Sequence, residues 1–96
     1  MLTWFIYDIT KNKTRRLIVK LAQEAGLYRV QKSVFFGDIE KNRLDEIVLH
    51  SEELIDPKTD SVYIFPMCKQ DFKASIFQGQ AFDKDLVTDE ISAFFL

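Results

Sequence analysis

Residues 2–9, Leu-Thr-Trp-Phe-Ile-Tyr-Asp-Ile, are the stretch of sequence that decides the fold. Aromatic and β-branched side chains fill this stretch, and only Thr3 and Asp8 interrupt its apolar run. Side chains of these types favour strands, because they pack well on a pleated surface. A short, almost continuous apolar run followed by a polar break predicts a buried central strand.

The next two segments change from a helical to a strand-like pattern. Apolar residues recur at three-to-four spacing over about residues 13–25, and Gly26 can supply a left-handed stop, so this segment predicts the first helix. Residues 27–39 read as strand, with a bend or hairpin near residues 31–33 or at Gly37. Their register is left open by the pattern.

A second helix and a further strand complete the predicted core. The helix is amphipathic, begins at Asp38 or Glu40 and must stop before Pro57. Residues 61–65 then read as a strand that ends at Pro66, because proline cannot donate a hydrogen bond to a sheet. The order β-α-β-β-α-β predicts an α+β, ferredoxin-like sandwich, with an antiparallel four-stranded sheet and two helices on one of its faces.

The length fits one domain with a thin margin of stability. We expect residues 1–96 to form a single ferredoxin-like domain whose core is about residues 1–66. Residues 67–96 are less regular, with a short turn expected near 69–73 and a possible strand at 75–77. This extension is a candidate to cover the bare face of the sheet or to pair with another protomer, because a chain this short gains buried surface by association.

Cysteine content and hydropathy bear on where the protein works. Cys68 is the only cysteine, and the sequence shows no signal peptide, which favours a reduced compartment. No stretch approaches the ~20 apolar residues that a membrane span needs. We therefore expect a cytoplasmic protein that does not engage a membrane.

The net charge of −2 conceals an uneven distribution along the chain. Residues 1–37 hold seven basic and two acidic side chains, a net charge of +5, whereas residues 38–96 hold six basic and thirteen acidic ones, a net charge of −7. A phosphate backbone responds to a local cluster of cations, so the first part can bind nucleic acid while the remainder faces solvent or a basic partner. The alternative is an ordinary solvated helix face.

Asp8 is the most informative single residue, because it is an acid at the end of a strand that is otherwise almost entirely apolar. An unpaired buried carboxylate is costly, so Asp8 needs a metal ion, a basic partner or access to solvent at the strand end. One carboxylate makes a poor Mg²⁺ site. Two copies of Asp8 related by a two-fold axis would suffice, since Mg²⁺ retains several of its waters.

Three runs taken in order resemble one known family. They are Tyr7-Asp8-Ile9, the segment Arg29-Val30-Gln31-Lys32-Ser33-Val34-Phe35-Phe36-Gly37, and Asp60-Ser61-Val62-Tyr63-Ile64-Phe65-Pro66-Met67-Cys68. Together with the basic start of the first predicted helix, they resemble CRISPR-associated protein family two from residue 1 to about 70. The resemblance implies a ferredoxin-like fold, a symmetric homodimer, and membership of a complex with the CRISPR integrase that captures foreign DNA as new spacers.

The resemblance also implies roles for individual residues. Asp8 matches the family's metal-binding and catalytic aspartate, which meets its symmetry mate at the dimer interface, and Tyr7 would help to shape that site. The metal implied is Mg²⁺, with Mn²⁺ as an alternative. Arg15 or Arg16, together with Arg29 and Phe35, match family positions implicated in nucleic-acid contact or activity, and Ser33 lies beside them. Lys11, Lys13 and both arginines are the cations expected to bind the backbone of nucleic acid. One departure is Phe36, which stands where many relatives carry Glu.

Two functions of different classes follow from this interpretation. The first is a binding module, a homodimer that bridges CRISPR integrase subunits and holds the backbone of duplex DNA during spacer acquisition. The second is an Mg²⁺-dependent endonuclease acting on single-stranded RNA or on DNA, within that machinery or as a free-standing endoribonuclease of the related toxin type. A non-catalytic ferredoxin-like dimer that binds a small ligand or protein is the third alternative.

Overall fold

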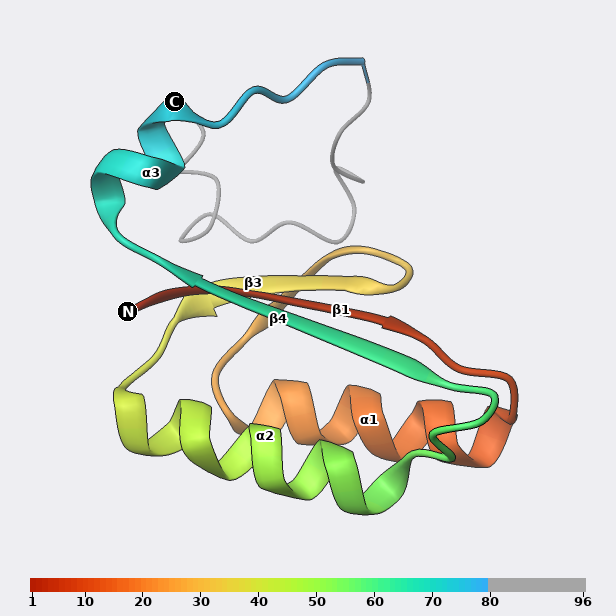
Figure 1. Cartoon of the computed structure of the whole chain (residues 1–96). Helices are drawn as coiled ribbons and strands as arrows, with labels where there is room; N and C mark the ends of the chain where they lie inside the picture. The colour runs from red at the N-terminus through yellow and green to blue at the C-terminus, as the bar shows by residue number, and fades with distance from the viewer. Residues whose placement is uncertain (80–96) are drawn as a thin grey trace.

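The computed structural model describes residues 1–79 (Figure 1). Its elements are β1 (Leu2–Asp8), α1 (Asn12–Glu24), β2 (Tyr28–Gln31), β3 (Val34–Asp38), α2 (Lys41–Leu54), β4 (Ser61–Met67) and α3 (Lys69–Ala74). The predicted strand, helix and hairpin order is therefore confirmed, with the hairpin turn at Lys32 and Ser33.

The four strands form one antiparallel sheet in the order β2-β3-β1-β4. Because β1 lies between β3 and β4, each helix connects two strands that are separated in the sheet by a third. This arrangement is the ferredoxin-like sandwich, and the predicted fold class is confirmed. The register places Phe5 opposite Phe35 of β3 and opposite Ile64 of β4, so the central strand carries the aromatic core.

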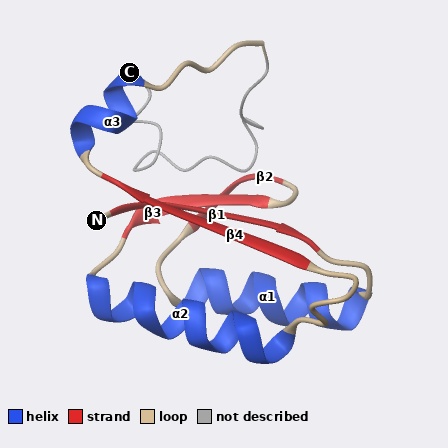
Figure 2. Ribbon diagram, viewed as in Figure 1, coloured by secondary structure: helices blue, strands red, loops and turns tan. Residues whose placement is uncertain are grey.

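Alternation along β1 divides its side chains between two layers (Figure 2). Phe5, Tyr7 and Ile9 pack with α1 and α2 on one face of the sheet. Leu2 and Trp4 face the opposite side, which α3 partly covers through Phe72. Successive residues of a strand point to opposite faces, so the nearly continuous apolar run of β1 serves two cores at once.

Phe36 packs on the side of the sheet that α3 covers. Its ring lies 4.4 Å from that of Trp4 and 5.0 Å from that of Phe72, centroid to centroid, and its side chain is fully buried. The position that departs from the family pattern therefore contributes apolar packing under α3.

Three expectations for residues 61–77 need correction. The strand predicted to end at Pro66 continues to Met67, with Pro66 opposite Thr3. Proline is tolerated there because β4 is an edge strand of the sheet that residues 1–79 form, in which β1 is its one neighbour. The turn expected near residues 69–73 is the helix α3, and residues 75–77 form no strand; Phe77 instead packs 5.8 Å from the ring of Trp4.

Gly26 and Gly37 were both expected at a turn or bend, and the structure confirms this for Gly26 but not for Gly37. Gly26 has a φ of +94°, the left-handed conformation expected where α1 ends. Gly37 makes no bend and lies within β3, where an added Cβ would sit 3.1 Å from the Gly26 carbonyl oxygen and 3.1 Å from Leu27 Cδ2. Gly37 thus permits a close approach between backbone segments.

None of the helices in residues 1–79 has the length and apolar character needed to cross a membrane. The expected pairing of the C-terminal extension falls largely on residues 80–96, which lie outside the described part of the chain.

Candidate functional site

Asp8 ends β1 at an exposed position, where its Cα pairs with that of Ser61 on β4. Its position in the alternation places it on the same face as Leu2 and Trp4, away from α1 and α2. Within residues 1–79 its carboxylate makes no hydrogen bond and no ion pair. Of the three environments considered for this acid, the single chain provides access to solvent.

Tyr7 lies on the opposite face of the sheet from Asp8. Its side chain is 3% exposed, and its hydroxyl donates a 2.8 Å hydrogen bond to the carbonyl oxygen of Lys32. The same hydroxyl oxygen accepts a 3.5 Å contact from Nη2 of Arg29. Within one chain Tyr7 therefore holds the β2–β3 turn and Arg29, and its ring does not share a face with Asp8.

Arg29 of β2 and Phe35 of β3 are paired across the β2–β3 hairpin. The guanidinium carbon of Arg29 lies 5.3 Å from the centre of the Phe35 ring, close enough for a cation–π interaction. Phe35 is fully buried, so the expectation that it contacts nucleic acid directly is wrong for this conformation. Among the residues described, Nε of Arg29 is buried without a hydrogen-bond partner.

The first turn of α1 carries the exposed cations expected from the sequence. Lys11 is the N-cap residue, the side chains of Lys13, Arg15 and Arg16 are exposed, and no acid occupies the first turn. The N-terminus of a helix carries partial positive charge, which adds to the field of these side chains. Nη2 of Arg15 donates a 3.2 Å hydrogen bond to the carbonyl oxygen of Thr10.

The fold brings most of the predicted residues to one end of the sheet. Asp8 leads directly into the cationic start of α1, and the carbonyl oxygen of Ser33 accepts a 3.1 Å hydrogen bond from the N–H of Tyr7. The β2–β3 turn therefore lies beside the end of β1. The exposed carboxylate of Asp8 and the exposed cations that begin α1 thus belong to the same end of the sheet.

Asp60 belongs to the same end of the sheet and was missed by the sequence reasoning. Its carboxylate accepts a hydrogen bond from the N–H of Thr10 at 3.1 Å and one from the N–H of Asp56 at 2.9 Å. These two backbone donors, Asp56 first, hold the pKa of Asp60 below its ordinary range. The turn composition of residues 56–60 marks a loop, but no local signal identifies Thr10 as a partner fifty positions away.

The side chains of residues 1–79 do not assemble a complete metal site. No group of three or more His, Cys, Asp or Glu side chains that could hold a metal ion occurs within the described residues. The donor chemistry of Asp8 suits Mg²⁺ or Mn²⁺, both of which prefer oxygen ligands. Within residues 1–79 no second acid joins Asp8 in such a group.

Comparison with known proteins bears on this arrangement. The family described as CRISPR associated protein Cas2 matches residues 1–75. The CRISPR-associated endoribonuclease Cas2 of Desulforudis audaxviator is 36% identical over 75 residues, which are 78% of this chain and 71% of the relative. The protein of the same name from Korarchaeum cryptofilum is 32% identical over 71 residues, covering 71% and 73% of the two chains.

Solved structures agree in the fold. The crystal structure of Streptococcus pyogenes Cas2 superposes with a TM-score of 0.68 at 27% identity and covers 82% of this chain and 100% of that one. A hypothetical protein from Thermus thermophilus, TT1823, gives a TM-score of 0.64 at 28% identity over 70% of this chain and 80% of that one. The matched family, the two relatives and the shared sheet and helix arrangement lead to one conclusion: this chain belongs to the CRISPR-associated Cas2 family.

Proposed function

We propose that this protein is a metal-dependent endonuclease that acts as a homodimer in the adaptation stage of CRISPR defence, in the cytoplasm. The observation that carries the proposal is the position of Asp8. It is an exposed carboxylate on the face opposite α1 and α2, immediately before the cationic first turn of α1. The names of the relatives, which describe endoribonucleases, support a nuclease activity and make single-stranded RNA the first substrate to test.

The proposed dimer forms through the sheet face that carries Asp8. Tyr63 and Phe65 of β4 are 50% and 49% exposed, and their rings are parallel within 2° at a centroid distance of 6.5 Å. They pair with Ile6 and Trp4 of β1, so they lie on the same face as Asp8. An exposed aromatic surface next to a partly covered core favours association, and a two-fold axis on this face would bring two copies of Asp8 toward each other.

Two Asp8 carboxylates fit Mg²⁺, because this ion retains waters and needs only one or two carboxylates from protein. Bound there, the ion would lower the pKa of a coordinated water and offset charge on the scissile phosphate. Lys11, Lys13, Arg15 and Arg16 would hold the neighbouring phosphates by charge and hydrogen bonds, with no contact to base edges. Binding without base readout predicts little sequence preference.

A second function, a DNA-binding bridge between integrase subunits, is favoured by the same cationic turn of α1. It requires the cations and the dimer but not the metal. The acidic part of the chain, residues 38–96 with a net charge of −7, would then face the integrase as a basic partner. Affinity for duplex DNA would fall steeply with rising salt, because counterions are released from the phosphates.

The variant Asp8→Asn separates the two functions, and Asp45→Asn is its matched control because Asp45 is an exposed acid on α2. Cleavage of labelled single-stranded RNA and of duplex DNA is measured over a titration of Mg²⁺. We expect D8N to abolish cleavage and D45N to preserve it, while both change the free energy of unfolding by less than about 0.5 kcal/mol, since both side chains are exposed. Cleavage that persists in D8N rules out the nuclease site. A wild-type protein that binds duplex DNA but cleaves neither substrate supports the bridging function instead.

A further inference from the structure

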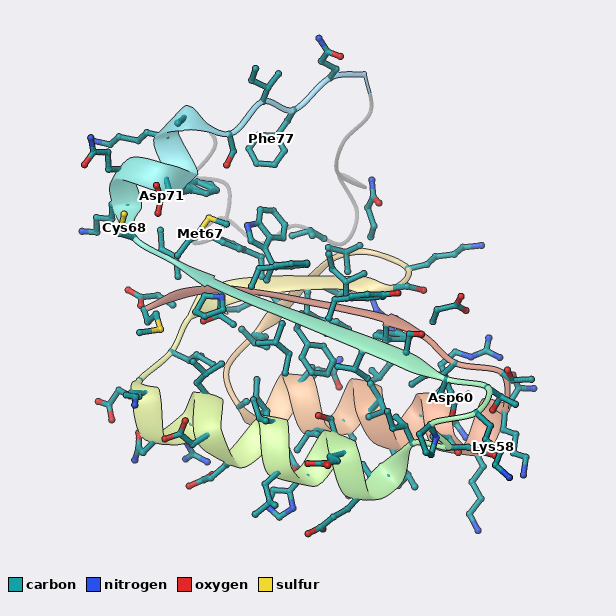
Figure 3. The ribbon with its side chains drawn as sticks, viewed as in Figure 1. Lys58, Asp60, Met67, Cys68, Asp71 and Phe77 are labelled. Atoms are coloured by element: carbon teal, nitrogen blue, oxygen red, sulfur yellow. The ribbon has the colours of Figure 1, made fainter. Side chains whose placement is uncertain are left out.

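Asp60 joins two loops that are far apart in the sequence (Figure 3). Figure 3 shows Asp60 and Lys58 where the α2–β4 loop meets the loop that leads from β1 into α1. Oδ1 of Asp60 accepts the N–H of Thr10 at 3.1 Å, and its Oδ2 accepts the N–H of Asp56 at 2.9 Å. Its carboxylate therefore bridges the β1–α1 loop to its own loop.

The neighbouring threonines strengthen the same bridge. The hydroxyl of Thr59 donates to Oδ1 of Asp60 at 3.2 Å, and the hydroxyl of Thr10 donates to the carbonyl oxygen of Thr59 at 3.4 Å. The Asp60 N–H donates a 2.8 Å hydrogen bond to the carbonyl oxygen of Asp56, which closes the turn. Thr10 thus donates two hydrogen bonds to the α2–β4 loop, one from its N–H and one from its hydroxyl, so its position is tied to that loop.

Thr10 passes this constraint to the candidate site. It stands two positions after Asp8 and immediately before Lys11, and its carbonyl oxygen accepts the hydrogen bond from Nη2 of Arg15 at 3.2 Å. The N–H of Arg15 in turn donates to the carbonyl oxygen of Lys11 at 3.0 Å, in the first turn of α1. A carboxylate fifty positions away in the sequence therefore holds Thr10, whose carbonyl oxygen is the acceptor for the Arg15 side chain.

We propose that Asp60 is a positioning residue, which fixes the β1–α1 loop and so holds Arg15 in the orientation that binds a phosphate backbone. The expected effect on binding rests on the proposed nucleic-acid function. The ordering of the β1–α1 loop rests only on the hydrogen bonds of Asp60. Asp60 itself would not touch nucleic acid, because a carboxylate repels phosphate. Its effect on binding would come from holding the β1–α1 loop in one conformation.

The sign of the effect separates positioning from simple electrostatics. Neutralising an exposed acid near a cationic surface strengthens binding to a polyanion when charge alone matters. Asp60→Asn also removes one negative charge, but it replaces a carboxylate oxygen by an amide NH₂. The NH₂ group cannot accept a hydrogen bond from the N–H of Thr10 or of Asp56, so the bridge between the two loops weakens. We therefore expect Asp60→Asn to lower the affinity for nucleic acid, although it removes a negative charge.

Asp56→Asn is the matched control, since it removes the same charge from the same loop. The Asp56 side chain accepts a hydrogen bond only within that loop, from the N–H of Lys58 at 3.0 Å. Fluorescence anisotropy with a labelled DNA duplex and a labelled single-stranded RNA measures affinity at several salt concentrations, below the unfolding transition of every variant. We expect D60N to bind about 3- to 10-fold more weakly than wild type, as for the loss of one well-placed charged contact. D56N should bind as well as wild type or more tightly.

A double-mutant cycle tests whether the effect passes through Arg15. If it does, Asp60→Asn should change the affinity of an Arg15→Ala protein by less than about twofold, because the group that it positions is already missing. If the two losses are fully additive, Asp60 does not act through Arg15 and the inference is overturned. The same conclusion follows if D60N binds as tightly as D56N.

Amide hydrogen exchange at Thr10 tests the structural part without any nucleic acid. We expect exchange at the Thr10 N–H to be faster by about tenfold in D60N and unchanged in D56N, because only D60N weakens its acceptor. If wild-type protein binds neither labelled probe, the proposed function fails while this measurement still decides the structural part. Unchanged exchange in D60N would overturn the inference, whatever the binding data show.

Discussion

Phe65→Ala tests whether the sheet face that carries Asp8 is the dimer interface. Phe65 is 49% exposed in the single chain, and a large aromatic side chain offers roughly 200 Å² of surface, so about 100 Å² remains to be buried by a partner. At about 25 cal/mol per Å² this area corresponds to about 2.5 kcal/mol. A two-fold interface uses the residue twice, which gives an upper limit of about 5 kcal/mol per dimer.

The measured change should be smaller than this limit, because association also costs side-chain freedom and leaves some polar groups imperfectly paired. We expect the dimer dissociation constant of F65A to rise on the order of 100- to 1000-fold. Sedimentation velocity over a range of protein concentrations measures it. Leu49→Ala is the control, because Leu49 is 55% exposed on α2, in the layer on the other side of the sheet.

Three results would refute this reasoning. The wild-type protein could remain monomeric at every concentration, the F65A constant could equal that of wild type, or L49A could weaken the dimer as much as F65A. Urea denaturation of each variant at concentrations below the dissociation constant checks that the fold of the monomer is kept. A loss of dimer in an intact monomer is the result that supports a two-fold arrangement of Asp8.

Two further predictions concern the buried pair at Phe35 and the carboxylate of Asp60. Phe35→Leu should lower the free energy of unfolding by roughly 1–2 kcal/mol, through a smaller core side chain and a lost cation–π contact. It should leave the affinity for nucleic acid within about twofold of wild type, because Phe35 is fully buried. A large loss of affinity in anisotropy measurements would show instead that the Phe35 side chain takes part in binding. For Asp60, the lowered folded-state pKa means that its contribution to stability is present above the unfolded-state pKa and is lost as the pH falls through the folded-state value. The difference in unfolding free energy between wild type and D60N should therefore be constant near neutral pH and shrink below about pH 4. Denaturation series at several pH values measure this difference. A difference that stays the same at low pH would disprove the prediction.

Local sequence patterns predicted most of the secondary structure correctly. The apolar run of residues 2–9, the three-to-four spacing before Gly26 and the position of Pro57 each predict an element that the structure contains within one or two residues. These signals succeed because they depend on neighbours along the chain. The errors fall in residues 66–77, where tertiary contacts decided the outcome: an edge position accommodates Pro66, and the rings of Trp4 and Phe36 give α3 a surface to pack on.

The candidate site shows a similar division. The period of two along β1 already implies that Tyr7 and Asp8 point to opposite faces, so this separation could have been anticipated from the sequence. The burial of Phe35 could not, because a strand-like run does not say which of its faces the helices cover. Asp60 was also out of reach of sequence reasoning, since its partner lies on a different loop.

The sequence by itself determined the kinds of element, their order along the chain and the family to which they belong. Hydrophobic period, turn residues and a specific run of side chains are properties of the covalent chain and need no knowledge of long-range contacts. Only the tertiary structure decided the order of strands in the sheet, which side of β1 each side chain serves, and the bridge from Asp60 to Thr10. Those features depend on which distant segments come into contact, and that choice is made by the burial of the whole core rather than by any one segment.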